Sequence, residues 1–288
     1  MASGGLQYNF ARLSIAEKLI ALNVLVFILD GLSRALLGNS VANWFELPKD
    51  FTEFFGQPWS LVTYSFFHAG IGHIFWNMIM LYFSGRIFLN LFDNQRFINV
   101  YFLGVIFGGI VFLLSYNVFP TLLDTNSVLI GASAGVTAVL IFICAYIPNQ
   151  EVRIIFFNVK LWHVGAFFIL VDLVQIAYGG NVGGRLAHLG GAFLGYVYAR
   201  QLLKGNDIGS GFTKFRDAVV QLFKPREKKA PMKTVYKKKT AKNKSTADYD
   251  KEAHQRKIDG ILDKISKSGY ESLSKAEKDF LFKAGKED

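Results

Sequence analysis

The sequence contains a single cysteine among its 288 residues. Cys144 lies inside an apolar run, and a chain with one cysteine has neither an internal disulfide framework nor a cysteine-based metal site. We expect no metal and no cofactor. The residues that carry chemistry must therefore be sought among other side chains.

Charged residues are scarce over residues 1–203, which hold 10 basic and 9 acidic side chains. Residues 204–288 hold 22 basic and 13 acidic side chains, so the net charge of +10 divides into +1 and +9. The first region has too few charges to cover a surface that faces water. A single soluble globule is therefore excluded.

Long apolar stretches fill the charge-poor region. A transmembrane helix needs about 20 mainly apolar residues. Six stretches approach that length: Leu19–Leu37, Ile71–Phe92, Ile98–Val118, Val128–Ile147, Leu161–Tyr178 and Leu186–Leu203. The first contains Asp30 and Arg34 and starts too far from the N-terminus for a signal peptide. We predict an all-α membrane protein with six transmembrane helices.

Basic residues near the six stretches predict their orientation. Lysine and arginine favour the cytoplasmic side, and with the N-terminus inside they are twice as frequent there, even before the basic tail is counted. Both termini are thus predicted to be cytoplasmic, in a multi-pass protein of a bacterial inner membrane. The connection Gly38–Gly70 is rich in aromatic residues, which indicates a loop lying in the outer leaflet or packed against the helices.

The region after Leu203 is predicted to form two parts. Residues 204–249 form a basic linker without apolar periodicity, typical of a disordered segment near anionic lipids. Residues 250–288 form a small helical hairpin, whose second helix opens with a capping box of Ser274 and Glu277. We expect the basic charge to determine topology and not to bind nucleic acid; the partner of this tail is unknown.

Four polar residues lie near the outer ends of predicted transmembrane helices, where such residues are costly unless paired or functional. Ser133 lies about five residues into the fourth, roughly 8 Å deep. His188 lies near the start of the sixth, and His73 and Asn77 share one face of the second. Their common depth predicts one site.

The chemistry of these residues is that of nucleophilic catalysis. A neutral histidine accepts the serine proton, and preorganised donors stabilise the oxyanion. Ser133 and His188 supply the first pair; His73, Asn77 and a backbone N–H supply the donors. A small-residue seam, Gly191-x-x-x-Gly195, lets a neighbouring helix approach closely.

Gly131–Gly135 also fits the nucleophile-elbow pattern G-x-S-x-G, with Ser133, Asp172 and His188 in the order of α/β-hydrolases. The apolar flanks argue against that fold. For Asp172 we favour a structural hydrogen-bonding role over one in orienting His188.

The segments His73–Asn77, Gly131–Ser133 and Ala187–Gly191 lie on the second, fourth and sixth helices, and with them the chain resembles the rhomboid family of intramembrane serine proteases. His68 fits the same pattern. The resemblance covers about residues 15–203, so that 1–203 is expected to form a six-transmembrane-helix rhomboid-like bundle. It implies a Ser133–His188 dyad, with His73, Asn77 and the Ser133 amide as oxyanion donors.

The sequence departs from this family at two positions. Ser60 follows Trp59 where an arginine is common, and Thr137 replaces an aromatic residue that stacks on the catalytic histidine in many members. Neither removes a reacting group, so we expect an active serine endopeptidase that cleaves membrane-protein substrates in the lipid bilayer. A non-catalytic membrane adaptor remains the alternative; a channel or transporter is disfavoured because no internal repeat is found.

Overall fold

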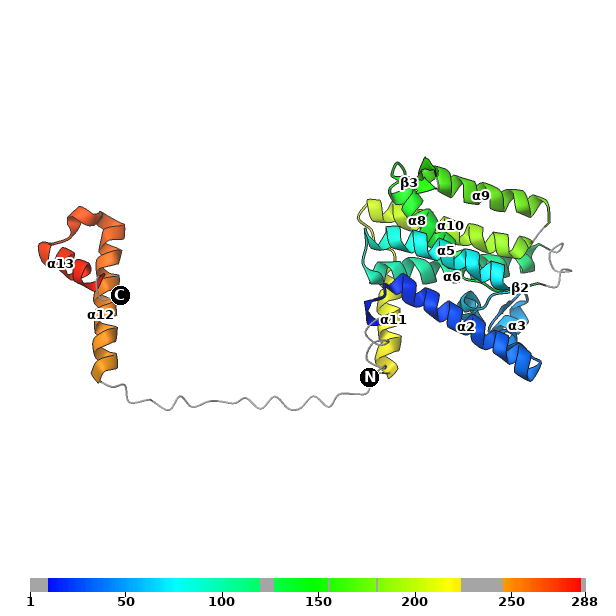
Figure 1. The fold of residues 1–288 in the computed structure, drawn as a ribbon, viewed down its shortest axis with the longest axis horizontal. Helices are drawn as coiled ribbons and strands as arrows, with labels where there is room; N and C mark the ends of the chain where they lie inside the picture. The colour runs from blue at the N-terminus through cyan, green and yellow to red at the C-terminus, as the bar shows by residue number, and fades with distance from the viewer. Residues whose placement is uncertain (1–9, 120–126, 155, 180, 224–245, 286–288) are drawn as a thin grey trace. The chain divides into compact units, whose positions relative to one another are not determined.

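The structure is a computed structural model that describes residues 10–119, 127–154, 156–179, 181–223 and 246–285. The chain divides into two compact units, Met1–Lys224 and Pro225–Asp288. Each is described separately below (Figure 1).

The first unit is a bundle of helices with short irregular connections. Its long helices are α2 (Ile15–Leu37), α5 (Ile71–Leu89), α6 (Asn94–Val118), α8 (Ser133–Tyr146), α9 (Leu161–Ala177), α10 (Val182–Leu203) and α11 (Ser210–Phe223). The connection after α2 contains η1 (Val41–Trp44), β1 (Leu47–Pro48), α3 (Phe51–Gly56), α4 (Ser60–Thr63) and η2 (Tyr64–Phe66). Each of the six apolar stretches thus contains one helix.

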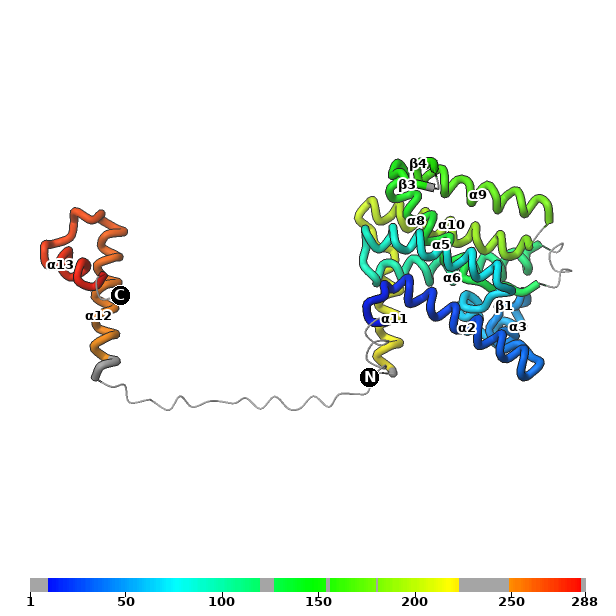
Figure 2. The backbone as a smooth tube through the Cα atoms, viewed as in Figure 1, coloured from blue at the N-terminus to red at the C-terminus, as the bar shows by residue number. Residues whose placement is uncertain are grey.

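Two short antiparallel sheets join the connections. β1 pairs with β2 (Val128–Leu129), Leu47 opposite Leu129, and this ties the first connection to the segment that enters α8. β3 (Glu151–Ile154) and β4 (Phe157–Lys160) form a hairpin between α8 and α9 (Figure 2).

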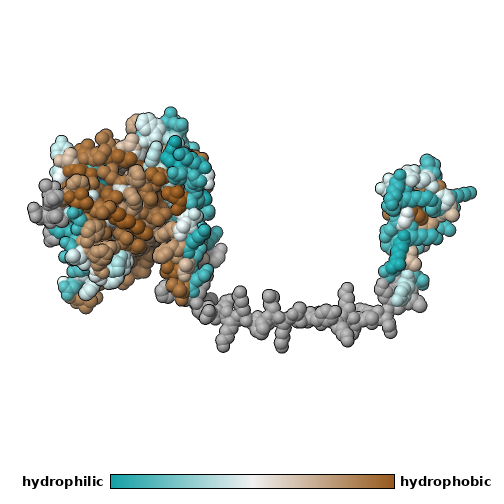
Figure 3. All heavy atoms as spheres, turned by 180° about the vertical axis from the view of Figure 1, so that it is seen from behind, coloured by the Kyte–Doolittle hydropathy of each residue, from teal (hydrophilic) through white to brown (hydrophobic). Residues whose placement is uncertain are grey.

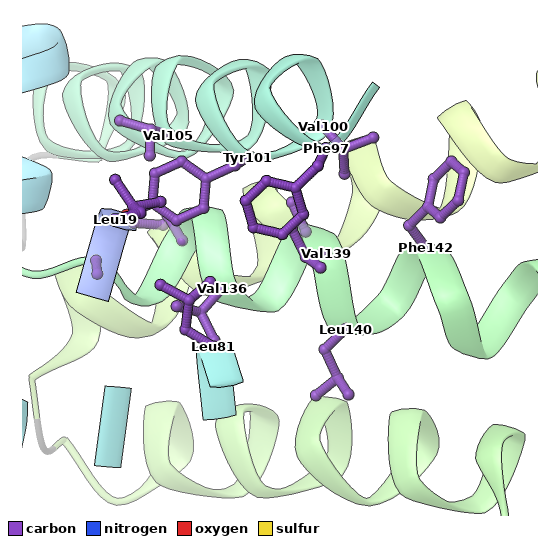
Figure 4. Packing of buried hydrophobic residues seen from close by; sticks show 14 of the residues in the cluster. Leu19, Leu81, Phe97, Val100, Tyr101, Val105, Val136, Val139, Leu140 and Phe142 are labelled. Atoms are coloured by element: carbon purple, nitrogen blue, oxygen red, sulfur yellow. The ribbon is translucent and has the colours of Figure 1, made fainter. Parts of the chain in front are cut away.

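Helix α8 forms the centre of the bundle and contacts α5, α6, α9 and α10. Nearly all of its residues from Ala134 to Cys144 are buried. Val136, Val139 and Phe142 of α8 pack among Leu81 of α5 and aromatic residues of α6 (Figure 4). The central position of α8 holds its first residue, Ser133, at a fixed place in the bundle.

Large apolar side chains cover much of the face of this unit that is seen in Figure 3. Leu25, Ile28 and Leu36 of α2 and Phe167 and Leu170 of α9 are all more than half exposed. A surface of this kind is unfavourable in water and matches a hydrocarbon environment. By length and composition, two of the described helices, α2 and α6, suffice to cross a membrane, while α8 and α9 are shorter apolar helices.

Helix α11 differs from the prediction that residues 204–249 form a disordered linker. Asp207, just before α11, accepts hydrogen bonds from Arg96 and Tyr198, and Thr213 accepts one from Asn99. These contacts attach the helix to α6 and α10, which the sequence pattern alone does not reveal. Residues 224–245 of the predicted linker lie outside the described residues.

The second unit contains α12 (Thr246–Ser268), η3 (Tyr270–Ser272) and α13 (Lys275–Ala284). The capping box of Ser274 and Glu277 at the start of α13 is confirmed, and Gly285 is the C-cap of the helix. Lys264 of α12 donates to Glu277 of α13 at 2.9 Å. The two helices therefore form a hairpin.

Candidate active site

A cavity of about 650 Å³ is lined by residues of α5, α8, α9 and α10. All four predicted site residues line it: His73 and Asn77 from α5, Ser133 from α8 and His188 from α10. The three helices that carry them each present their N-terminal part to this cavity. The structure therefore brings together the residues that the sequence places at one depth.

Ser133 is the first residue of α8, which changes the depth argument. The sequence treats Val128–Ile147 as one helix, but Val128 and Leu129 form a strand and Ala132 is the N-cap. A rise of 1.5 Å per residue does not apply to this extended approach, so the predicted depth of 8 Å has no basis. The new position is chemically favourable, because the first N–H groups of a helix lack intrahelical partners and carry partial positive charge.

Gly131 brings His73 close to Ser133. Gly131 has φ +120°, a conformation that side-chain-bearing residues rarely adopt. A Cβ atom there would lie 2.7 Å from Nε2 of His73 and 3.7 Å from Oγ of Ser133. The hydrogen atom of glycine thus leaves open the space that separates the histidine from the serine.

The contacts of His73 indicate which of its ring nitrogens carries a proton. The backbone N–H of Ala69 donates to Nδ1 of His73 at 3.4 Å. A neutral imidazole that accepts at one nitrogen donates from the other. His73 therefore presents an Nε2–H donor toward the space beside Ser133, and the buried Asn77 lies one helical turn further along α5.

The segment before Ser133 is fixed by the first connection. Gly131 N–H donates to the carbonyl of Tyr64 at 3.0 Å, and Ala132 N–H approaches Nε2 of His68 at 3.5 Å. His68 is 2 % exposed. Its position supports the backbone at the nucleophile, a role that spacing alone did not specify.

The first connection is held without an arginine after Trp59. Asp30 of α2 accepts from the Ser40 hydroxyl at 2.8 Å and from the Ala42 N–H at 3.1 Å. The Trp59 indole donates to the Trp44 carbonyl at 2.8 Å. Three aromatic residues of this connection pack against the core: Phe51, Phe54 and Phe66. Trp44 and Phe55 are exposed. The connection therefore packs against the helices and also carries aromatic side chains on its outside.

The predicted small-residue seam is confirmed. A Cβ atom on Gly191 would lie 2.2 Å from the carbonyl oxygen of Ala134, and one on Gly195 would lie 2.2 Å from that of Ala138. Only glycine permits this approach of α10 to α8. Because Gly191 follows His188 by about one turn and Ala134 follows Ser133 directly, the seam holds the serine and histidine segments side by side.

His188 has a partner that sequence reasoning ranked as less favoured. Its Nδ1 lies 3.1 Å from Oδ1 and 3.2 Å from Oδ2 of Asp172 in α9. Arg185 also donates to Oδ1 of Asp172, at 2.8 Å. Arg185 was not singled out from the sequence; its spacing of three residues before His188, on the same face of a helix, was the available signal.

Gly183 and Gly184 precede His188 in the first turn of α10. Asn181 caps α10, and Gly183 and Gly184 lie buried inside the helix. A Cβ atom on Gly183 would lie 2.6 Å from the rings of Phe112 and Tyr116. These two glycines serve close packing at the start of α10.

Among the described residues, no hydrogen bond joins Ser133 Oγ to His188 Nε2. Such bonds are often long in unliganded enzymes and tighten when a substrate binds. Thr137, one turn after Ser133, lines the same cavity, so the wall beside the histidine is polar at the position of the family's aromatic residue.

Each unit matches the model of a protein family. The rhomboid domain matches residues 55–205, and a family of unknown function, DUF6576, matches residues 247–284. The RHOMBOID-like protein 12, mitochondrial, of Arabidopsis thaliana is 31% identical over 163 residues, which cover 52% of this chain and 48% of that protein.

Two further relatives come from an animal and a protist. The Presenilin-associated rhomboid-like protein, mitochondrial, of Homo sapiens is 28% identical over 186 residues, covering 62% of this chain and 46% of the relative. Rhomboid-like protease 1 of Toxoplasma gondii is 29% identical over 142 residues, covering 49% and 46%. The chain thus spans less than half of the length of these relatives. Since the rhomboid domain covers more than half of the sequence, from the first connection to the end of α10, the chain belongs to the rhomboid family.

Proposed function

We propose that this protein is an intramembrane serine endopeptidase that hydrolyses peptide bonds in or next to transmembrane segments of other membrane proteins. The observation that carries the proposal is the meeting of Ser133, His188, His73 and Asn77 from three helices on one cavity. Family membership supports it, since rhomboid proteins are often serine proteases of this kind.

In the proposed reaction, Ser133 Oγ attacks the carbonyl carbon of the scissile bond while His188 accepts the serine proton. His188 then gives that proton to the departing amine, which leaves an acyl group on Ser133. A water molecule, deprotonated by His188, hydrolyses the acyl-enzyme and restores both side chains. No metal or cofactor takes part in these steps.

The oxyanion forms beside the N-terminus of α8. His73 Nε2–H, the Asn77 amide and the N–H of Ser133 are the proposed donors. Because the partial positive charge of the helix terminus and the donors are in place before reaction, they stabilise the transition state without reorganisation.

The proposed topology has six transmembrane helices, α2, α5, α6, α8, α9 and α10, with both termini in the cytoplasm. The exposed apolar side chains on α2 and α9 support contact with lipid. The +9 charge after residue 203 favours the cytoplasmic side. We propose a bacterial inner membrane; the mitochondrial names of two relatives make a mitochondrial membrane the alternative.

The test is cleavage of a model single-span substrate in proteoliposomes. A substrate with small, helix-breaking residues near the outer interface is suitable, because a transmembrane helix hides its carbonyls until it unwinds. Ser133→Ala and His188→Ala are expected to abolish cleavage, and Asn77→Ala to lower kcat by up to about 10²–10³. Undiminished cleavage by either of the first two variants contradicts the dyad, and substrate binding without cleavage by the wild type identifies a non-catalytic adaptor.

A further inference from the structure

Asp172 and Arg185 form an ion pair beside His188 that the dyad mechanism does not use; Asp172 is buried and Arg185 is partly exposed. Asp172 is 5 % exposed and comes from α9, while Arg185 and His188 lie one turn apart on α10. An ionised carboxyl group inside an apolar helix is energetically unfavourable unless a specific partner stabilises it. The contacts it makes are with these two residues.

We infer that Asp172 is the positioning residue of a Ser133–His188–Asp172 triad, held in place by Arg185. The inference rests on the proposed protease function and goes beyond it, because the dyad alone requires no acid.

The geometry at His188 determines its tautomer. Nδ1 of His188 faces both oxygens of Asp172, at 3.1 and 3.2 Å, and a carboxylate only accepts hydrogen bonds. Nδ1 therefore carries a proton. A neutral ring then has an unprotonated Nε2, which is the form that takes the proton of a serine.

Arg185 fixes the carboxylate from the other side. Its guanidinium donates to Oδ1 of Asp172 at 2.8 Å, and its charge offsets that of the acid where water is scarce. Asp172 thus cannot turn away from His188 without losing a charged hydrogen bond. This restricts the imidazole at a position where Thr137 offers no ring to stack on.

The alternative is that Asp172 only neutralises Arg185. Two observations argue against it: both carboxylate oxygens lie within hydrogen-bond distance of His188, and both contact the same ring nitrogen, Nδ1, so that Nε2 is not engaged by the acid. In serine proteases with a triad, the acid occupies the same place relative to its histidine, and its replacement by asparagine lowers kcat by about 10⁴.

The first measurement is independent of activity. In the full chain with ¹⁵N-labelled histidine in lipid bilayers, NMR is expected to show a single Nδ1–H tautomer for His188, identified by its loss in His188→Gln. Asp172→Asn is expected to give a mixture of tautomers, because an amide both donates and accepts. A wild-type His188 protonated on Nε2 overturns the inference, whether or not the protein is a protease.

The second measurement separates positioning from charge neutralisation. Asp172→Asn is expected to lower kcat by at least about 10-fold with little change in KM, since a positioning residue acts on the chemical step. The double variant Asp172→Asn/Arg185→Gln removes both charges, and it is expected to remain slow. Recovery of wild-type kcat in the double variant shows that Asp172 only neutralises Arg185.

Asp30 provides the matched control. It is 4 % exposed, pairs with Arg34 at 2.7 Å and lies in α2, away from the cavity. Asp30→Asn is expected to reduce thermal stability yet leave the His188 tautomer as in the wild type. Wild-type kcat in Asp172→Asn, with Ser133→Ala inactive, refutes the triad and leaves the proposed protease function standing.

Discussion

The unit Met1–Lys224 buries polar and charged side chains within its apolar core and exposes large apolar side chains on its helices, whereas no described charged side chain of the unit Pro225–Asp288 is buried. The first buries Asp30, His68, Asn77 and Asp172, while Ile261 and Leu273 are the buried hydrophobic residues described in the second. The described charged residues of the second unit form exposed pairs such as Lys267 with Asp263. The surrounding medium explains the difference: lipid permits an apolar exterior, and water requires a polar one.

This difference explains why the candidate active site lies in the first unit. In the first unit each buried polar group needs a partner, and these partners fix the nucleophile, the histidine and the loop that supports them. In the second unit, ion pairs in water contribute little. Substitutions that add a single carbon atom should therefore be severe where segments of the first unit approach closely, and mild at its open positions and in the second unit.

Among substitutions outside the proposed Ser133–His188 pair, the largest effect is expected for Gly131→Ala. The added methyl group would lie 2.7 Å from the His73 ring, in a backbone conformation unfavourable for alanine. We expect cleavage activity to fall by about 10²–10³, as on loss of an oxyanion donor. The assay is proteoliposome cleavage with Gly56→Ala as control, because no atom lies within 4 Å of a Cβ there. Full activity of Gly131→Ala would remove His73 from the proposed oxyanion site.

A smaller effect is expected for Gly191→Ala, which tests the seam between α8 and α10. Its Cβ would lie 2.2 Å from the Ala134 carbonyl oxygen, and overpacking of this kind costs about 1–3 kcal/mol. The expected result is a lower Tm in detergent micelles. Gly31→Ala and Gly260→Ala, one in each unit and both in open space, should leave Tm unchanged or slightly raised. Equal Tm values for all three variants would contradict the close approach.

The smallest effect concerns the tail. The Lys264 ammonium and the capping contacts of Ser274 lower the pKa of Glu277 to about 2 from an ordinary value of 4.5. The ionised carboxylate therefore stabilises α13 above pH 4.5, and this contribution is lost as the pH falls toward 2. The protection of α13 amides against hydrogen exchange, relative to the intrinsic exchange rate at each pH, should decrease over that range, and Glu277→Gln should remove the dependence. Cleavage activity of Glu277→Gln at neutral pH should equal that of the wild type.

Much of the fold was predictable because apolar runs and small-residue spacing are local signals. Each of the six stretches contains a helix, and the seam of Gly191 and Gly195 could be recognised from its spacing. The boundaries of the helices were harder to predict from the sequence. Val128–Leu129 is apolar enough to read as helix, but it pairs with Leu47–Pro48, a contact between segments about 80 residues apart in the sequence.

The meeting of Ser133, His188, His73 and Asn77 could be predicted because all four lie near the ends of apolar stretches on the same predicted side of the membrane, although the depth assigned to Ser133 was wrong. Their roles remain predictions. From the sequence, the contact of Asp172 with His188 was ranked below a structural role, because the sequence does not show the rotation of α9 about its axis. The helix α11 was missed for a similar reason, since its attachment through Asp207 and Arg96 depends on tertiary contacts.

The most direct test of the central claim is labelling of the full chain in lipid by a serine-reactive fluorophosphonate, with the modified peptide identified by mass spectrometry. The account predicts modification of Ser133 in the wild type, none in Ser133→Ala, and strongly reduced labelling in His188→Ala. Absence of labelling in a folded wild-type protein, or equal labelling of Ser133→Ala, would contradict it.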